Sequence, residues 1–303
     1  YWLDNYAKIN TAPKTYQRYT ELANHIIKYL GKIEVQKLKP LHVQQFYSNL
    51  LEKGELSKST ILKIHRVFHI AFKHAVQWQI INYNPLDAIT PPRTEKIEMK
   101  VWDIITANKF LEFIKDDIIY IPVLLALHTG MREGEICALK WNDVNFKDGC
   151  ITVRNTLQKI NGKFILKEPK SAKSIRTIAL MDSTIKALKE HRKKQAEIIL
   201  LMGQNYQNDD FVCAWNDGRP IDPLYIAKKF PKLIAKYNFP HIRFHDLRHT
   251  HATMLLQQGI HPKIVSERLG HSTINITLDT YSHVLPNIQK EAVQKLEKFF
   301  TQR

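Results

Sequence analysis

Residues 245–251 read His245-Asp246-Leu247-Arg248-His249-Thr250-His251, and this stretch carries most of the information about the fold. On a helix, residues three apart share a face, so His245 and Arg248 would lie side by side. A cation next to a proton donor can clamp a phosphate group. His245 and His249 also approach the His-Glu-x-x-His pattern of zinc hydrolases, but Arg248 would place a fixed cation beside the metal. The stretch therefore favours a phosphate site over a zinc site.

A second informative segment lies upstream, at residues 129–135, and reads Thr-Gly-Met-Arg-Glu-Gly-Glu. Gly130 is expected to end one helix, and the next helix is expected to begin at once. Arg132 would then lie near a helix start, where free N–H groups and the helix dipole favour an anion. Glu135 follows three residues later. It is expected to support the site, to cap the helix or to face solvent, and the sequence leaves these alternatives open.

Two more segments lie downstream, at residues 269–272 and 278–283. Gly270 can end a helix in the left-handed conformation, and Ser272 can cap the next helix, which places His271 at the junction. Residues 264–277 also fit a helix-turn-helix, which would bind DNA without chemistry. Tyr281 is one of 12 tyrosines, so it carries meaning only together with the other segments.

In this order and spacing, the segments resemble the tyrosine recombinase (phage integrase) family. The catalytic half of that family carries Arg, Lys, His-x-x-Arg, His or Trp, and Tyr. The matching positions here are Arg132, Lys170, His245, Arg248, His271 and Tyr281. Lys173 lies in the same loop as Lys170, so either lysine can be the matching one. The resemblance is strong over residues 129–284 and weaker over residues 1–90.

The resemblance implies a covalent mechanism on DNA that needs no metal and no other cofactor. Tyr281 would attack a phosphodiester and form a 3′-phosphotyrosyl link. Arg132 and Arg248 would hold the phosphate oxygens, and a phenol of pKa near 10 must lose its proton as it attacks. His245 is the expected base or proton relay, and Lys170 the expected donor to the leaving 5′ hydroxyl. His271 would hydrogen-bond the phosphate.

The charge balance of the chain agrees with a polyanionic partner. Forty-five Lys and Arg residues against 29 Asp and Glu residues give a net charge of +16. Such a charge attracts DNA, but it also attracts membrane surfaces and acidic proteins. A helix predicted from residue 57 or 59 has an apolar face and an opposite basic face. The expected DNA contacts on it are Lys58, Lys63, Arg66 and Lys73, with Lys173 added from the second half; a solvated charged face is the alternative.

Compartment signals are few. The three cysteines are widely spaced and form no Cys-x-x-Cys pair, which fits a reducing cytoplasm. No apolar run approaches the roughly 18 residues of a membrane span, and no signal peptide is recognised. We therefore expect a bacterial cytoplasmic protein associated with the nucleoid and not with a membrane. The chain begins at Tyr1, and the sequence does not tell whether an arm-binding domain precedes it.

The length of 303 residues suits two domains better than one. We expect an all-α core-binding (SAM-like) domain at residues 1–92 and a proline-rich, charged linker that ends at residue 102. A mixed α+β, mostly helical catalytic domain would follow at residues 103–303. Runs at 150–157 and 163–166 flank Asn161-Gly162, a tight-hairpin signal. With residues 175–180 they predict one small three-stranded antiparallel sheet.

The resemblance also implies an assembly. An apolar stripe at helical spacing over residues 286–300 would dock on a neighbouring protomer, forming a homo-tetramer on two double-stranded DNA attachment sites. The expected function is integration and excision of a mobile element, with an accessory DNA-bending or excision factor as a further partner. The alternatives are a non-catalytic DNA-binding regulator and a nicking-closing enzyme like a type IB topoisomerase.

Overall fold

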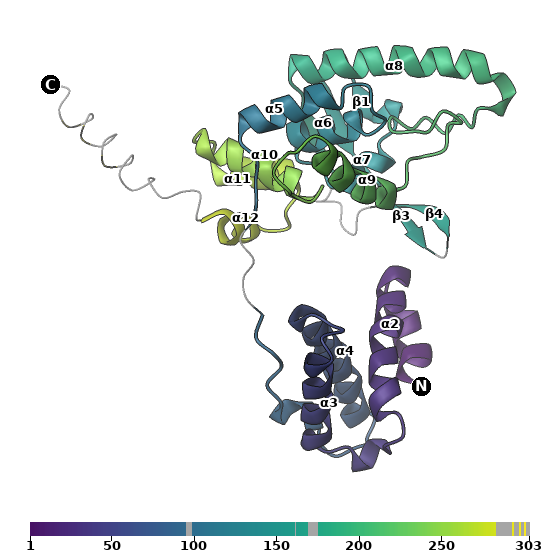
Figure 1. Ribbon diagram of the computed structural model, residues 1–303, viewed down its shortest axis with the longest axis vertical. Helices are drawn as coiled ribbons and strands as arrows, with labels where there is room; N and C mark the ends of the chain where they lie inside the picture. The colour runs from purple at the N-terminus through teal and green to yellow at the C-terminus, as the bar shows by residue number, and fades with distance from the viewer. Residues whose placement is uncertain are drawn as a thin grey trace. The chain divides into compact units, whose positions relative to one another are not determined.

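The computed structural model describes residues 1–94, 99–160, 162–168 and 175–282, together with the single positions 293, 297 and 300. The chain divides into two compact units, Tyr1–Glu98 and Met99–Arg303. Figure 1 shows the first unit built from helices alone and the second from helices with short strands.

The first unit is a helical bundle formed by α2 (Pro13–Leu30), α3 (Pro40–Glu52) and α4 (Lys58–Gln77). Short helices surround them at Leu3–Ala7, Lys8–Asn10, Val35–Lys37 and Pro85–Ala88. Both α2 and α3 begin at a proline, whose fixed φ suits the first helical position, and Ser57 caps α4 through the N–H of Thr60. Helix α4 begins where the sequence predicts a helix, from residue 57 or 59.

The core of this unit forms where α3 and α4 bring their apolar stripes together. Phe46 and Leu50 of α3 pack in one buried cluster with Ile61, Ile64 and Phe68 of α4. These residues recur at three- and four-residue spacing, so each helix buries one face and leaves the other to water. The outer face of α4 is therefore free to carry charge.

The second unit contains helices α5 to α12 around two small sheets. The helices are α5 (Ile104–Phe113), α6 (Tyr120–Thr129), α7 (Glu133–Ala138), α8 (Asp182–Met202), α9 (Pro223–Lys236), α10 (Asp246–Gln257), α11 (Pro262–Leu269) and α12 (Ile274–Tyr281). The strands are β1 (Val144–Asn145), β2 (Cys150–Val153), β3 (Thr156–Ile160), β4 (Lys163–Lys167) and β5 (Arg176–Ala179). In the described ranges, no helix combines the length and the apolar character that crossing a membrane requires.

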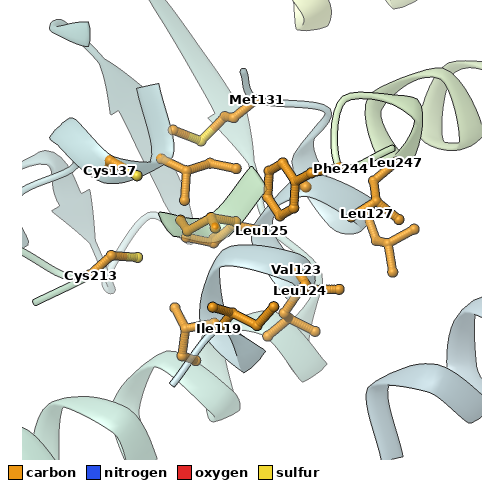
Figure 2. Close-up of a cluster of buried hydrophobic side chains, with 14 of the residues drawn as sticks. Ile119, Val123, Leu124, Leu125, Leu127, Met131, Cys137, Cys213, Phe244 and Leu247 are labelled. Atoms are coloured by element: carbon orange, nitrogen blue, oxygen red, sulfur yellow. The ribbon is translucent and has the colours of Figure 1, made fainter. Parts of the chain in front are cut away.

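Helix α6 is the centre of the second unit. It is apolar on all sides and buried on all sides, as expected for a helix that other elements enclose. Figure 2 shows side chains of α6, including Leu125 and Leu127, close to Phe244 and to Leu247 of α10. Because α10 packs directly on α6, the residues of its other faces are held by a rigid core.

The strands differ from the single sheet that the sequence predicts. The predicted run 150–157 is two strands, β2 and β3, interrupted at residues 154 and 155. Strand β2 lies between β1 and β5 in an antiparallel sheet, whereas β3 and β4 form a separate two-stranded hairpin. Local β-propensity continues through the interruption, so only the long-range pairing of β2 with β5 reveals it.

The predicted linker is too long at its C-terminal end. Trp102, placed in the linker by the sequence, is 3% exposed and lies in the core of the second unit. Its indole N–H donates to the Pro240 carbonyl at 2.9 Å, and its backbone N–H donates to Thr250 Oγ1 at 3.2 Å. A lone tryptophan beside charged residues carries no periodicity, and its burial depends on partners about 140 residues away.

Candidate active site

A cavity of about 650 Å³ lies in the second unit where five separate segments meet. Its walls come from the α6–α7 turn, the β2–β3 region, α10, the α11–α12 turn and α12 itself. Five of the six expected catalytic residues line it together with Glu135: Arg132, His245, Arg248, His271 and Tyr281. The structure therefore brings together side chains that lie up to about 150 residues apart in the chain.

Arg132 is positioned by the turn between α6 and α7. Gly130 ends α6 with φ +68°, and a Cβ there would lie 2.6 Å from the Leu269 side chain, so glycine is required on both grounds. Arg132 caps α7, and its backbone N–H donates to Glu135 at 2.9 Å. Its guanidinium donates to Glu135 at 2.8 Å and to the Gly270 carbonyl at 3.2 Å. These bonds hold Arg132 at the edge of the cavity.

Glu135 has a second partner that the sequence did not reveal. Arg176, at the start of β5, donates from both terminal nitrogens to the carboxylate of Glu135, at 2.7 and 3.2 Å. Burial opposes the ionised carboxylate, but the hydrogen bonds and charge of Arg176 outweigh it, with help from Arg132, and the pKa of Glu135 falls to about 2. Of the roles left open, Glu135 combines support of Arg132 with capping of α7.

Arg248 projects from α10 and is only 3% exposed. One terminal nitrogen donates to the Gly130 carbonyl at 2.7 Å, while Nη2 is buried and has no hydrogen-bond acceptor within the described part of the chain. Burial and then the neighbouring Arg132 lower the pKa of Arg248 to about 9. A buried N–H group without an acceptor is costly, so this nitrogen can bind an acceptor that enters the cavity.

His271 lies at the turn between α11 and α12. Gly270 ends α11 with φ +68°, and Thr273 is the N-cap of α12 in place of the expected Ser272. His271 Nδ1 lies 2.8 Å from Thr277 Oγ1, a contact that orients the ring toward α12. Burial, followed by the charges of Arg248 and Arg132, lowers the pKa of His271 to about 4.

Tyr281 closes the cavity from the end of α12. It is 1% exposed, and its hydroxyl lies 2.7 Å from Nδ1 of His249 on α10. Burial raises the pKa of Tyr281 to about 12, although the charge of Arg248 opposes this. His245, the base expected from the sequence, packs its ring edge-on against His249 with centroids 5.1 Å apart. The histidine in contact with the phenol is therefore not the one that sequence reasoning selected.

The zinc interpretation of His245 and His249 finds no third ligand. Over the described residues, no group of three or more His, Cys, Asp or Glu side chains has the geometry to hold a metal ion. His249 forms a hydrogen bond with the Tyr281 hydroxyl, and the neighbouring Arg248 of α10 donates to the Gly130 carbonyl.

Comparison with known proteins gives this arrangement a family. The model of the phage integrase family matches residues 105–287, and the model of the phage integrase N-terminal SAM-like domain matches residues 1–51. The chain belongs to the phage integrase family. The recombinase is thus an enzyme of the tyrosine recombinase type, and its activity is site-specific DNA recombination. Membership in a family of enzymes sets aside the interpretation as a regulator without chemistry.

Relatives of this recombinase are named recombinases and integrases. A protein named tyrosine recombinase XerC-like, from Caldanaerobacter subterraneus subsp. tengcongensis, is 33% identical to the chain. The alignment covers 99% of the chain and 81% of that protein. The ICEBs1 integrase of Bacillus subtilis is 29% identical over 96% of the chain and 79% of its own length. These relatives extend over both units.

Solved structures support the fold. The Tn1549 transposon integrase, in complex with a circular intermediate DNA, superposes with a TM-score of 0.82 at 24% identity and 95% coverage of both chains. A lambda integrase dimer bound to a core site superposes with a TM-score of 0.70 at 19% identity, and the match covers 95% of both chains. Together with the SAM-like match, they confirm the expected fold class of a helical domain followed by a mixed, mostly helical one.

Several residues expected from the sequence remain outside this site. Lys170, Lys173 and all but three positions of the predicted docking helix at 286–300 lie outside the described residues. Lys58, Lys63, Arg66 and Lys73 belong to the first unit, where all four side chains are exposed on α4. His65 and His74 of the same helix are engaged instead, by the Tyr47 hydroxyl at 3.0 Å and the Trp2 indole at 2.9 Å.

Proposed function

We propose that the cavity of the second unit is the active site, in which Tyr281 cleaves one DNA strand and stores the bond as a 3′-phosphotyrosine. The observation that carries this proposal is the convergence of Arg132, Arg248, His271 and Tyr281 on one cavity of about 650 Å³. Guanidinium and imidazole groups stabilise developing negative charge on phosphate, and a phenol supplies an oxygen nucleophile.

The scissile phosphate binds between the two arginines in this proposal. Nη2 of Arg248 is buried without an acceptor, and a non-bridging phosphate oxygen would supply one. Arg132 is half-exposed and already oriented by Glu135, so it can approach the second oxygen without reorganising. His271 is oriented by Thr277, which leaves its Nε2 for a third hydrogen bond to the phosphate.

The chemical step then follows from the positions of the groups. The Tyr281 oxygen loses its proton to a base of the cavity and bonds to phosphorus, the bond from phosphorus to the 5′ oxygen breaks, and the leaving oxygen takes up a proton. We propose Lys170, or alternatively Lys173, as the donor of that proton, from the sequence pattern alone. A 5′ hydroxyl of a partner strand later attacks the phosphotyrosine, which restores the phenol and completes the exchange without a cofactor.

The first unit is proposed to contain the core-binding domain, which the sequence places at residues 1–92, and the second unit, from Met99 onward, to be the catalytic domain. Lys63, Arg66 and Lys73 lie three and seven residues apart on α4, so they share one side of the helix, with Lys58 near its start. An exposed basic helix face suits contacts to the phosphate backbone, which position a protein on DNA without reading sequence.

The assembly proposed for strand exchange is a homo-tetramer on two duplexes at attachment sites, with the helix at residues 286–300 docking on a neighbouring protomer. Relatives named integrase and transposase support integration and excision of a mobile element as the reaction. An accessory DNA-bending or excision factor is a further expected partner. Because the DNA of such an element resides in the bacterial cytoplasm, we propose that the enzyme acts there, on the nucleoid.

A covalent-trapping assay tests the proposed function. The protein is mixed, in EDTA, with nicked duplexes from the ends of its mobile element, and SDS-resistant protein–DNA bands are counted. We expect a band that Tyr281→Phe abolishes while DNA binding persists. A band that survives in the variant would show that another residue is the nucleophile. Cleavage and religation without strand transfer between two duplexes would favour a topoisomerase-like activity.

A further inference from the structure

The contact between His249 and Tyr281 raises the question of which group donates the hydrogen bond and which accepts it. The Tyr281 hydroxyl is buried, and its one hydrogen bond among the described residues is to His249 Nδ1 at 2.7 Å. A buried phenol must donate its O–H to an acceptor, whereas an imidazole Nδ1–H in this place would leave the phenol proton unbonded. The tautomer of His249 with its ring proton on Nε2 satisfies the phenol, because Nδ1 then accepts the O–H of Tyr281.

Both partners are neutral in the free protein. Burial lowers the pKa of His249 to about 4, and the charges of His245, Arg248 and Arg243 add to this effect while Asp246 opposes it. Burial likewise raises the pKa of Tyr281. The proton accordingly stays on the phenol while the cavity holds no anion.

We propose that His249 is the proton acceptor for Tyr281 during attack on the phosphate, a role that rests on the proposed function of Tyr281. As the phenol oxygen bonds to phosphorus, its proton moves to His249 Nδ1, and the 5′ oxygen leaves with a proton from a separate donor. In the reverse step, His249 returns the proton as the 5′ oxygen displaces the phenol. In this proposal His245 does not take the phenol proton, and its ring packs edge-on against the acceptor His249.

Occupancy of the cavity controls this transfer. Arg248 is one of the cations that hold His249 neutral, and its buried Nη2 has no acceptor among the described residues. A phosphodiester between Arg132 and Arg248 offsets their positive charge, so an imidazolium at position 249 becomes less unfavourable. Other groups that face His249 are His245, Asp246 and Arg243 of its own segment, Tyr281 of α12, and His271 of the α11–α12 turn. The phenol is thus activated only when DNA is bound.

His249→Asn tests the proposal, because the asparagine side chain can accept the same hydrogen bond at the position of Nδ1 but cannot take the proton. The measurement is the single-turnover rate of covalent complex formation on a nicked duplex, at saturating protein, from pH 5.5 to 9.5. We expect unchanged DNA affinity and a rate loss of about 100-fold near pH 7. The rate of the variant should rise tenfold per pH unit, since the phenol must now ionise beforehand, while the wild type levels off.

Fluorotyrosine at position 281 provides the diagnostic rescue, because fluorine lowers the phenol pKa. We expect it to restore much of the lost rate in His249→Asn and to change the wild-type rate little. His128→Asn is the matched control: His128 Nδ1 also lies 2.8 Å from a hydroxyl, that of Thr184, and burial also lowers its pKa to about 4, but it does not line the cavity. It should keep the wild-type pH profile.

The outcomes separate the two proposals. A His249→Asn protein with the wild-type rate and profile, or a slow protein with the wild-type profile and no fluorotyrosine rescue, would overturn the role of His249. Covalent complexes in Tyr281→Phe would instead overturn the nucleophile. If His249→Asn loses thermal stability and DNA binding, the pH–rate profile and the fluorotyrosine rescue are measured on His249→Gln instead. That variant then decides whether His249 accepts the proton.

Discussion

The outer face of α4 in the first unit and the cavity of the second unit both present cations, in opposite physical settings. Lys63, Arg66 and Lys73 are exposed on α4. In the cavity Arg248 is almost fully buried and Arg132 is half-exposed, and Arg176, which pairs with Glu135 beside them, is also almost fully buried. Exposed cations keep their hydration, are screened by salt, and bind phosphate as roughly independent charges. Buried guanidinium groups lose their hydration, so each needs a fixed partner and a fixed geometry. The first region suits affinity for DNA, and the second suits chemistry on one phosphate.

The largest effect that would sharpen this contrast is expected from Arg248→Lys. The variant keeps the charge but loses the planar fork that contacts Gly130 and leaves Nη2 for the phosphate. We expect the covalent-complex rate to fall by about 100- to 1,000-fold with little change in DNA affinity. Single-turnover cleavage and a filter-binding titration measure the two quantities.

Arg243→Lys is the control for this change, because Arg243 lies on the same segment but its side chain is 72% exposed and pairs with Asp246. It should cleave at nearly the wild-type rate. An Arg248→Lys rate as high as that of Arg243→Lys would show that charge alone suffices in the cavity, and the contrast with α4 would disappear.

An intermediate effect is expected from Glu135→Gln, measured as the free energy of unfolding of the second unit in urea between pH 3 and 7. The pKa of Glu135 is about 2 in the folded protein against 4.5 for a free glutamate, so the ionised carboxylate stabilises the fold by about 3 kcal/mol above pH 5. Because the folded pKa is the lower one, this stabilisation decreases as the pH falls from about 4.5 toward 2. The difference in the free energy of unfolding between wild type and Glu135→Gln should therefore narrow as the pH falls from about 5 to 3.

Glu267→Gln serves as the exposed counterpart, since Glu267 pairs with Lys263 at 3.3 Å and both side chains are more than half exposed. We expect a change within about 0.5 kcal/mol at every pH. A Glu135→Gln gap that does not vary with pH would contradict the assignment of a buried, ionised carboxylate between Arg132 and Arg176.

The smallest effects are expected on α4. Lys63→Gln and Arg66→Gln should each weaken DNA binding a few-fold and reduce the slope of log affinity against log salt by about 0.9. The cleavage rate at saturating protein should stay at the wild-type value. Lys14→Gln, which removes an exposed charge from α2, is the control and should leave the slope unchanged. A loss of cleavage at saturation would show that α4 takes part in more than binding.

Much of the fold follows from local patterns. The apolar spacing of Phe46, Leu50, Ile61 and Ile64 is sufficient to predict α3 and α4, because a helix with one apolar stripe must bury it. Gly130 and Gly270 end helices in the left-handed conformation, as their positions between helical runs indicate. The division between β2 and β3 and the burial of Trp102 were not predictable, since both depend on partners far along the chain.

The residues of the candidate site also divide into those that the sequence indicates and those that depend on distant partners. The order and spacing of the segments, through their resemblance to the tyrosine recombinases, single out Arg132, His245, Arg248, His271 and Tyr281, and all five line one cavity. Arg176 carries no local signal, because its partner Glu135 lies 41 residues away. His249 was set aside with the zinc pattern, because a helical repeat of four shows which residues share a face but not what faces them.

The sequence by itself determined the residue types, their order, the helix ends that present them and the family. The tertiary structure decided which histidine meets the phenol of Tyr281 and which arginine neutralises Glu135. The physical reason is that hydrogen-bond partners and pKa values depend on burial and on charges within a few ångströms. In a folded chain those neighbours come from distant segments, which no local pattern specifies.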